Sequence, residues 1–218
     1  MIFFEIDVDI EIAIENVFPT FTPWNNLVNM PKYQLEQTFS SLTYTEGDLD
    51  YTDFEGCIFN HCEFSAATFV GVTFIDCTFN QCNFNSAKIN YVAFRTAHFN
   101  ACKMKDVNFA MCDKLIFEIH FKDCILDFSK FYALKIKGTT FSNCSMVAVD
   151  FMSTDLSEVV FDRCDLYRAE FERAIASKAD FSSSTNYTIN PELTKIKKAI
   201  FSLEGAKGLL SHHQIIVE

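Results

Sequence analysis

Phenylalanine recurs at every fifth residue over most of this chain of 218 residues. The first phase of the repeat runs from position 39 to position 109 and has Phe at 11 of its 15 positions. The phase breaks at Lys114, and a second phase, two residues out of register, runs from Ile116 to Phe181 with Phe at 7 of 14 positions. Because 18 of the 25 Phe lie on this repeat, the fold must bury them in a periodic way.

A column of small residues lies two positions before the repeating Phe. Cys, Ala, Val, Ser and Thr fill almost all of it, and all nine Cys belong to it. A five-residue step would spiral around an α-helix and would alternate between the faces of a straight strand, so neither element buries every Phe. Residues two apart do share one face of an extended segment. We therefore expect short extended segments joined by turns, with four units closing a coil of about 20 residues.

Triplets of a small residue, Asp or Asn, and Phe or Leu recur within this pattern. Two of them are Cys82-Asn83-Phe84 and Ala179-Asp180-Phe181. The pattern resembles that of the pentapeptide-repeat family over about residues 39–183. The resemblance implies an all-β fold, a right-handed quadrilateral β-helix of about seven coils. It would lie between an N-terminal extension and cap at 1–38 and a C-terminal helical cap or dimerisation segment at 184–218.

Glycine and proline patterns predict the turns and the C-terminal end. Between Val72 and Pro191 the only Gly is Gly138, and there is no Pro. Turns that require positive φ select Gly or Asn, so we expect turns that ordinary residues can form. Asn190, Pro191 and Glu192 have the order of a helix start, which predicts a short helix to about residue 198. A second helix opening at residues 202–204 would be weakened by glycines at 205 and 208.

The first 29 residues differ from the repeat. Apolar and acidic residues alternate over residues 2–15, which is a strand pattern, and a loop with two prolines follows up to residue 31. An extra strand, a partner site and an upstream extension remain open interpretations. The first 14 residues contain no Lys or Arg, unlike a signal peptide, and no apolar run approaches the roughly 18 residues of a membrane span. We expect a cytoplasmic protein that does not interact with membranes.

The nine Cys raise the possibility of metal sites or disulfides. The zinc spacing C-x2-C is absent, but Cys at steps of 20 would stack. If the two extra residues loop out, one ladder joins Cys62, Cys82, Cys102, Cys124, Cys144 and Cys164, within disulfide reach. The odd count and the lack of an export signal favour small buried hydrophobes in a reducing compartment.

We find no site for chemistry. The five His do not group with acids or Cys at ligand or catalytic spacing, and no Gly-rich phosphate loop or hydrolase motif occurs. We therefore expect no metal, no cofactor and no enzymatic activity.

The charge of the chain is uneven. Its net charge of -11 argues against direct nucleic acid binding, which needs a cationic surface. Residues 33–87 contain eight acids and no base, whereas residues 88–189 contain 13 of each. Five of the early acids are candidates for mimicry of DNA phosphates, although a solvated surface is the simpler interpretation of any one of them. They are Glu46, Asp48, Asp50, Asp53 and Glu55.

The closing segment Asn190-Pro191-Glu192, followed by a Lys-rich stretch that is expected to be helical, resembles in particular the Qnr and microcin-immunity branch of the family. That resemblance implies a non-enzymatic DNA mimic that binds DNA gyrase or topoisomerase IV, with quinolone or toxin resistance as an outcome. Qnr proteins protect gyrase through protruding loops, and here the register break offers only a small bulge at Asp113, Lys114 and Leu115. The break therefore argues against drug protection more than against gyrase binding.

The resemblance also implies a homodimer. In gyrase-directed members of the family, C-terminal apolar segments form the dimer. The corresponding residues here are Leu209, Leu210, Ile215, Ile216 and Val217. An alternative function is that of a structural interaction module with an unrelated protein partner, which the balanced charge of residues 88–189 would suit.

Overall fold

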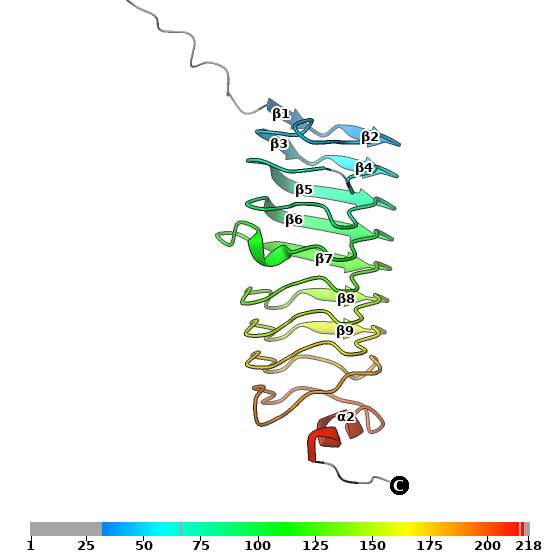
Figure 1. Cartoon of the computed structure of the whole chain (residues 1–218), viewed down its shortest axis with the longest axis vertical. Helices are drawn as coiled ribbons and strands as arrows, with labels where there is room; N and C mark the ends of the chain where they lie inside the picture. The colour runs from blue at the N-terminus through cyan, green and yellow to red at the C-terminus, as the bar shows by residue number, and fades with distance from the viewer. Residues whose placement is uncertain (1–31, 66, 214, 216–218) are drawn as a thin grey trace, which may run out of the picture. The chain divides into compact units, whose positions relative to one another are not determined.

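The computed structural model describes residues 32–65, 67–213 and 215. The strand and loop predicted before residue 32 lie outside these residues. The described chain winds into a parallel β-solenoid whose coils stack along one axis (Figure 1). This confirms the predicted fold class, an all-β quadrilateral β-helix.

In the described part of the chain, nine parallel strands follow one another along the stack. Their order is β1, β3, β5, β6, β7, β8 and β9, while β2 and β4 pair beside the first of them. Their bounds are Lys32–Leu35 (β1), Thr38–Ser40 (β2), Thr52–Glu55 (β3), Ile58–Asn60 (β4), Thr73–Asn80 (β5), Ala93–Asn100 (β6), Glu118–Lys122 (β7), Thr140–Ser142 (β8) and Val160–Asp162 (β9). Before the break each residue pairs with the one 20 positions later, as Phe59 does with Phe79. Isolated bridges continue this register on the other walls.

The repeating Phe form the core as continuous columns of rings. Phe79 is fully buried and stacks on Phe59 and Phe99 with ring centroids 4.9 and 4.8 Å apart. It meets the neighbouring columns edge to face, at 5.1 Å from Phe74 and 5.4 Å from Phe84. The centroid spacing within a column matches the strand spacing of about 4.8 Å. Because edge-to-face packing is favourable for aromatic rings, each coil both continues the columns and joins them.

The residues of the small-residue column have a second role besides fitting beside the Phe rings. Its hydroxyl and thiol groups donate hydrogen bonds to carbonyl oxygens of the preceding coil. Thr154 Oγ1 donates to the Phe131 carbonyl at 2.8 Å, and Cys102 Sγ donates to the Phe79 carbonyl at 3.3 Å. The column therefore favours residues that are small and can donate a hydrogen bond to backbone.

The cysteines are buried and none forms a disulfide. The interpretation of these residues as small buried hydrophobes agrees with that arrangement. The expected ladder across the register break also forms, because Cys102 contacts both Cys82 and Cys124. Hydrogen bonds to these neighbouring thiols, together with burial, raise the pKa of Cys102.

The turns differ from the prediction. Twenty-four non-glycine residues have φ between 51° and 64°, among them Ala101, Phe128 and Arg168. All but Glu36 and Asn186 lie two positions after the repeating core residue, as Ala101 does after Phe99. Ordinary residues do form the turns, but they do so in the left-handed region that we expected the turns to avoid. The coil imposes this conformation at most corners, although not at Met111 or Ser183, and the scarcity of Gly gave no sign of it.

The solenoid extends further at its C-terminal end than predicted, and the helix expected at residues 190–198 is wrong. The Asn190 side chain accepts a hydrogen bond from the Glu192 amide at 2.9 Å, which closes a single turn. The chain then returns to the ladder, where Lys195 pairs with Ile175 and Ile200 with Asp180. The expected C-terminal helical segment is instead α2, Lys207–Leu210, followed by a 3-10 turn, η3, Ser211–His213.

Candidate protein-binding surface

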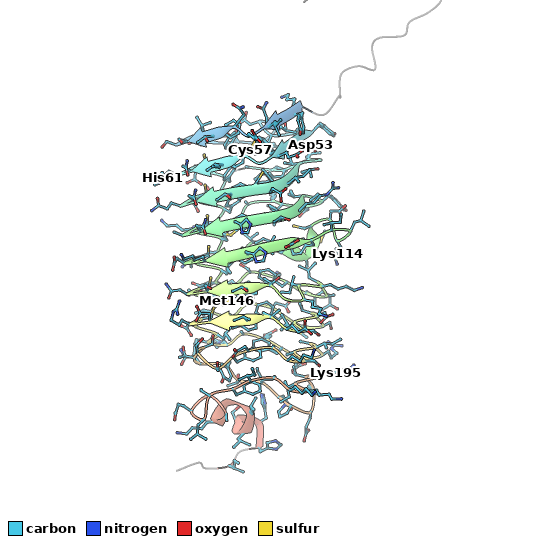
Figure 2. All side chains as sticks on the ribbon, turned by 180° about the vertical axis from the view of Figure 1, so that it is seen from behind. Asp53, Cys57, His61, Lys114, Met146 and Lys195 are labelled. Atoms are coloured by element: carbon cyan, nitrogen blue, oxygen red, sulfur yellow. The ribbon has the colours of Figure 1, made fainter. Side chains whose placement is uncertain are left out.

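The five candidate acids lie in one stretch of the first coils. Glu46 and Asp48 are exposed in the turn that follows Tyr44, and Asp50 is half-buried at the next corner. On β3, Asp53 and Glu55 point outward and alternate with the inward-facing Thr52 and Phe54. Figure 2 shows Asp53 near the N-terminal end of the stack. The acids therefore occupy two adjacent sides of one coil.

Local hydrogen bonds hold two of these carboxylates. Asp48 Oδ2 accepts from the Thr45 amide at 2.7 Å and from the Thr45 hydroxyl at 2.8 Å. The Thr45 hydrogen bonds lower the pKa of Asp48 below its ordinary value, so this carboxylate stays ionised. The Tyr33 hydroxyl donates to Glu55 Oε2 at 2.6 Å, and that hydrogen bond raises the pKa of Tyr33.

In the described part of the chain, ion pairs occur at some acids of the later coils but at none of the five candidate acids. Among the described residues, none of the five candidate acids is within 4.0 Å of a basic group. In the later coils Glu158 lies 2.9 Å from Lys178 and 3.6 Å from Lys137, and the hydrogen bond from Lys178 lowers its pKa. The unpaired early acids therefore project a negative field over this part of the surface.

The register-break loop projects from the stack between β6 and β7 (Figure 1). A 3-10 turn, η2, Phe109–Met111, precedes it, and Asp113 Oδ1 accepts a hydrogen bond from the Leu115 amide at 2.8 Å. Leu115 is 84% exposed, and the Lys114 side chain points outward (Figure 2). The bulge predicted at these residues is present.

The prediction that the repeat resumes at Ile116 is wrong. Ile116 is 53% exposed, whereas Phe117 packs against the core and its ring meets that of Phe94 at 6.5 Å. A shift of register between Arg95 and Ala97 accommodates the change. The spacing pattern alone could not distinguish these two adjacent apolar residues.

The predicted dimer segment is only partly described. Leu209 packs against the end of the core, while Leu210 and Ile215 are 38% and 54% exposed. Ile216 and Val217 lie outside the described residues. Leu209 thus serves the cap, and Leu210 and Ile215 remain candidates for a contact between protomers.

Two His form a pair that the sequence spacing concealed. His98 of β6 and His120 of β7 are register partners, and their rings stack with centroids 5.0 Å apart. His120 Nε2 lies 3.5 Å from Glu118 Oε1. The step of 22 residues across the break is the signal that could have predicted this pair. No set of three or more His, Cys, Asp or Glu among the described residues is arranged to hold a metal ion.

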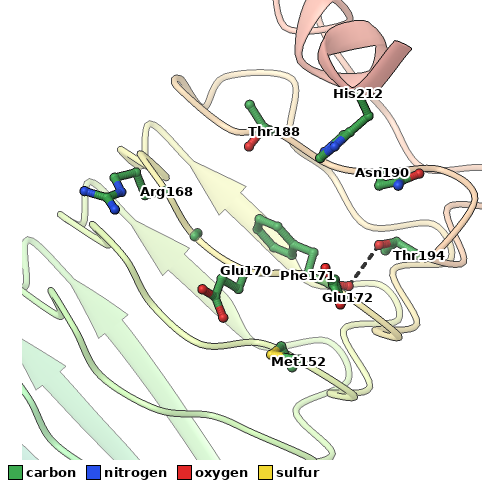
Figure 3. Close-up of a pocket in the computed structure, with 10 residues that line it drawn as sticks. Met152, Arg168, Glu170, Phe171, Glu172, Thr188, Asn190, Thr194 and His212 are labelled. Atoms are coloured by element: carbon green, nitrogen blue, oxygen red, sulfur yellow. Dashed lines mark hydrogen bonds between the residues drawn. The ribbon is translucent and has the colours of Figure 1, made fainter. Parts of the chain in front are cut away.

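A pocket of about 290 Å³ lies where the last coils meet η3 (Figure 3). Glu170, Glu172, Asn190 and His212 are among the residues that line it. Its Thr194 hydroxyl donates to the Phe171 carbonyl at 2.9 Å, so this group serves the coil. The pocket is at the small end of ligand sites. In the described part of the chain, no helix is both long and apolar enough to span a membrane.

The five-residue repeat, the four-sided coil and the stacked rings define a protein built from pentapeptide repeats. A family model described as pentapeptide repeat region matches residues 52–114 and 114–190. The chain belongs to the pentapeptide-repeat family. No curated protein matched the chain in a sequence search.

Two solved structures of low identity also match the chain. Full-length QnrB1, a plasmid-mediated fluoroquinolone resistance protein, is 14% identical with a TM-score of 0.42, over 84% of this chain and 100% of that one. HetL, a pentapeptide-repeat protein involved in heterocyst differentiation regulation from the cyanobacterium Nostoc sp. strain PCC 7120, is 14% identical with a TM-score of 0.40. That match covers 79% of this chain and 86% of HetL.

Proposed function

We propose that the chain is a non-enzymatic binding protein that docks on a type II DNA topoisomerase, DNA gyrase or topoisomerase IV, in place of duplex DNA. The observation that carries the proposal is the acidic surface of residues 33–87, which contain eight acids and no base. Its five candidate acids have no basic group within 4.0 Å among the described residues. The resemblance of the repeat to the gyrase-directed branch supports the choice of partner.

The mechanism is competition for a cationic DNA-binding surface. Carboxylates clustered on a rigid coil attract such a surface at long range and match its charge at contact. Coil packing fixes β3, so Asp53 and Glu55 need little ordering on binding. The short register-break loop suits competition with DNA better than protection of a drug site. A bacterial topoisomerase as partner places the protein in the cytoplasm.

A supercoiling assay with purified gyrase tests the proposal. We expect the wild-type protein to inhibit or protect gyrase at micromolar concentration, and the effect to weaken as salt rises. The variant Glu46→Gln, Asp53→Asn, Glu55→Gln should need at least about tenfold more protein. The matched late-coil variant Glu170→Gln, Glu172→Gln, Glu192→Gln should act like wild type. No effect on gyrase together with no co-purification would refute the proposal.

The second candidate is an interaction module for an unrelated protein. The balanced charge of residues 88–189 favours it, because such a surface has no preference for a strongly cationic partner. Wild-type protein that leaves gyrase supercoiling unchanged but co-purifies with another protein would favour this candidate.

A further inference from the structure

One corner of the coil is apolar along most of its length. We call it the apolar corner. It consists of Tyr51, Val70, Tyr91, Met111 and Tyr132, one from each successive coil, and Leu115 of the register-break loop follows Met111 by four residues. These side chains are between 40% and 84% exposed. Backbone hydrogen bonds join the row, from the Tyr51 amide to the Val70 carbonyl and from the Tyr91 amide to the Met111 carbonyl, both at 2.8 Å.

The apolar corner continues past Gly71, which has no side chain. A Cβ at Gly71 would lie 3.0 Å from Tyr51 Cδ1, so the Tyr51 ring covers the glycine. Gly71 also has a φ of 62°, which suits glycine. Tyr51 and Tyr91 therefore flank a flat interval, and the corner has no polar interruption at this coil.

The diagonally opposite corner has a different chemistry. There Asn60, Asn80 and Asn100 form an amide ladder with hydrogen bonds of 2.9 and 3.0 Å. A third corner has only two widely exposed aromatic residues, Phe128 and Tyr167. Solvated corners on the same coils thus show that the fold does not require apolar residues at these positions. Contiguous exposed apolar side chains of this kind mark interaction surfaces.

The spacing of the apolar corner fits an α-helix that lies along the coil axis. From Tyr51 to Tyr132 there are four coil steps, roughly 19 Å at the strand spacing. An α-helix of about 13 residues spans that length, and its pitch of about 5.4 Å is close to the coil step. One helical turn can therefore rest on each coil.

Charge decides which helix fits. The apolar corner begins on the acidic surface of residues 33–87, where Asp50 and Asp53 lie within two residues of Tyr51, while Asp113 and Lys114 adjoin it further along. The chain has a net charge of -11, so repulsion disfavours a second copy of it as occupant. We propose that the apolar corner binds an amphipathic α-helix of a partner protein, with basic residues beside its apolar stripe. This binding does not require a topoisomerase as the partner.

The test uses a fluorescein-labelled synthetic peptide of about 14 residues, helical, with Leu on one face and Lys beside it. Fluorescence anisotropy should show micromolar binding to the full chain. The variant Tyr91→Asn, Leu115→Asn leaves the charge unchanged and alters two exposed positions, and it should bind at least about tenfold more weakly. Tyr167→Asn, at another corner, is the matched control and should bind like wild type.

Three outcomes would overturn the proposal. A scrambled peptide of equal composition that binds as tightly would show attraction by charge alone. Equal loss in the Tyr167→Asn variant would show that the corner is not the site. Sedimentation in which Tyr91→Asn, Leu115→Asn converts a wild-type dimer to monomer would assign the corner to a contact between copies.

Discussion

At the scale of single residues, the corner position two after each core residue governs the backbone. It has a positive φ in residues as different as Ala101, Glu158 and Arg173. A left-handed conformation costs an L-residue about 1–2 kcal/mol, and the coil repeats that cost at most of its corners. Hydrogen bonds to the neighbouring coil, such as that from the Ala101 amide to the Lys122 carbonyl at 2.8 Å, offset it.

We predict that Ala101→Gly leaves the protein as stable as wild type or more stable, by up to about 1 kcal/mol. Glycine removes the left-handed penalty, and this gain exceeds or balances its greater entropy in the unfolded chain. Chemical denaturation followed by circular dichroism measures the change. Lys103→Gly is the control on the same coil, at an exposed position of the β-bridge ladder, and should lose about 0.5–1 kcal/mol. Equal losses in both variants would contradict the argument.

At the scale of elements, the columns of rings determine where the chain can go. The spacing of Phe predicted these columns correctly, because an inward ring at each fifth residue leaves the coil few alternatives. The failures came where the pattern was locally ambiguous. Ile116 and Phe117 are adjacent apolar residues, and packing against Phe94 decided between them. The sequence Asn190-Pro191-Glu192 suits either a helix or a turn, and the open ladder at Ile175 selected the turn.

The columns predict a severe effect of charge in the core. Phe79→Asp should destabilise the protein by about 4 kcal/mol or more, because it removes a ring that packs on Phe59 and Phe99 and buries an unpaired carboxylate. The loss of cooperative thermal unfolding would report it. Phe79→Leu is the control and should fold with a smaller loss. Near-wild-type stability of Phe79→Asp would contradict the assignment of the core.

At the scale of the whole molecule, charge and apolar surface are distributed along the solenoid in different ways. Acids gather before residue 88, the apolar corner runs from Tyr51 to Tyr132, and the helical cap follows the last coil. The candidate acids could be chosen from the sequence, since they come from ten consecutive residues. The apolar corner could not, because its residues look like isolated exceptions until the coil places them one above another.

We predict a homodimer formed through exposed apolar residues of the C-terminal segment. We expect sedimentation at twice the chain mass, with Leu210→Glu, Ile215→Glu shifting the protein to monomer because both side chains are exposed and apolar. Thermal stability should change little. Leu203→Glu, at a residue that is 93% exposed, is the control and should remain a dimer. A wild-type monomer at tens of micromolar would show that this segment serves only as a cap.

The sequence by itself determined the coil, its core columns and the position of the break, since a strict five-residue repeat has one economical way to bury its rings. Three features needed the tertiary structure: left-handed corners, the final return to the ladder, and the surfaces assembled from residues 20 apart. The physical reason is that these depend on contacts between coils. The repeat specifies what faces inward, while stacking decides which outward residues become neighbours, as Tyr51 and Gly71 or His98 and His120 do.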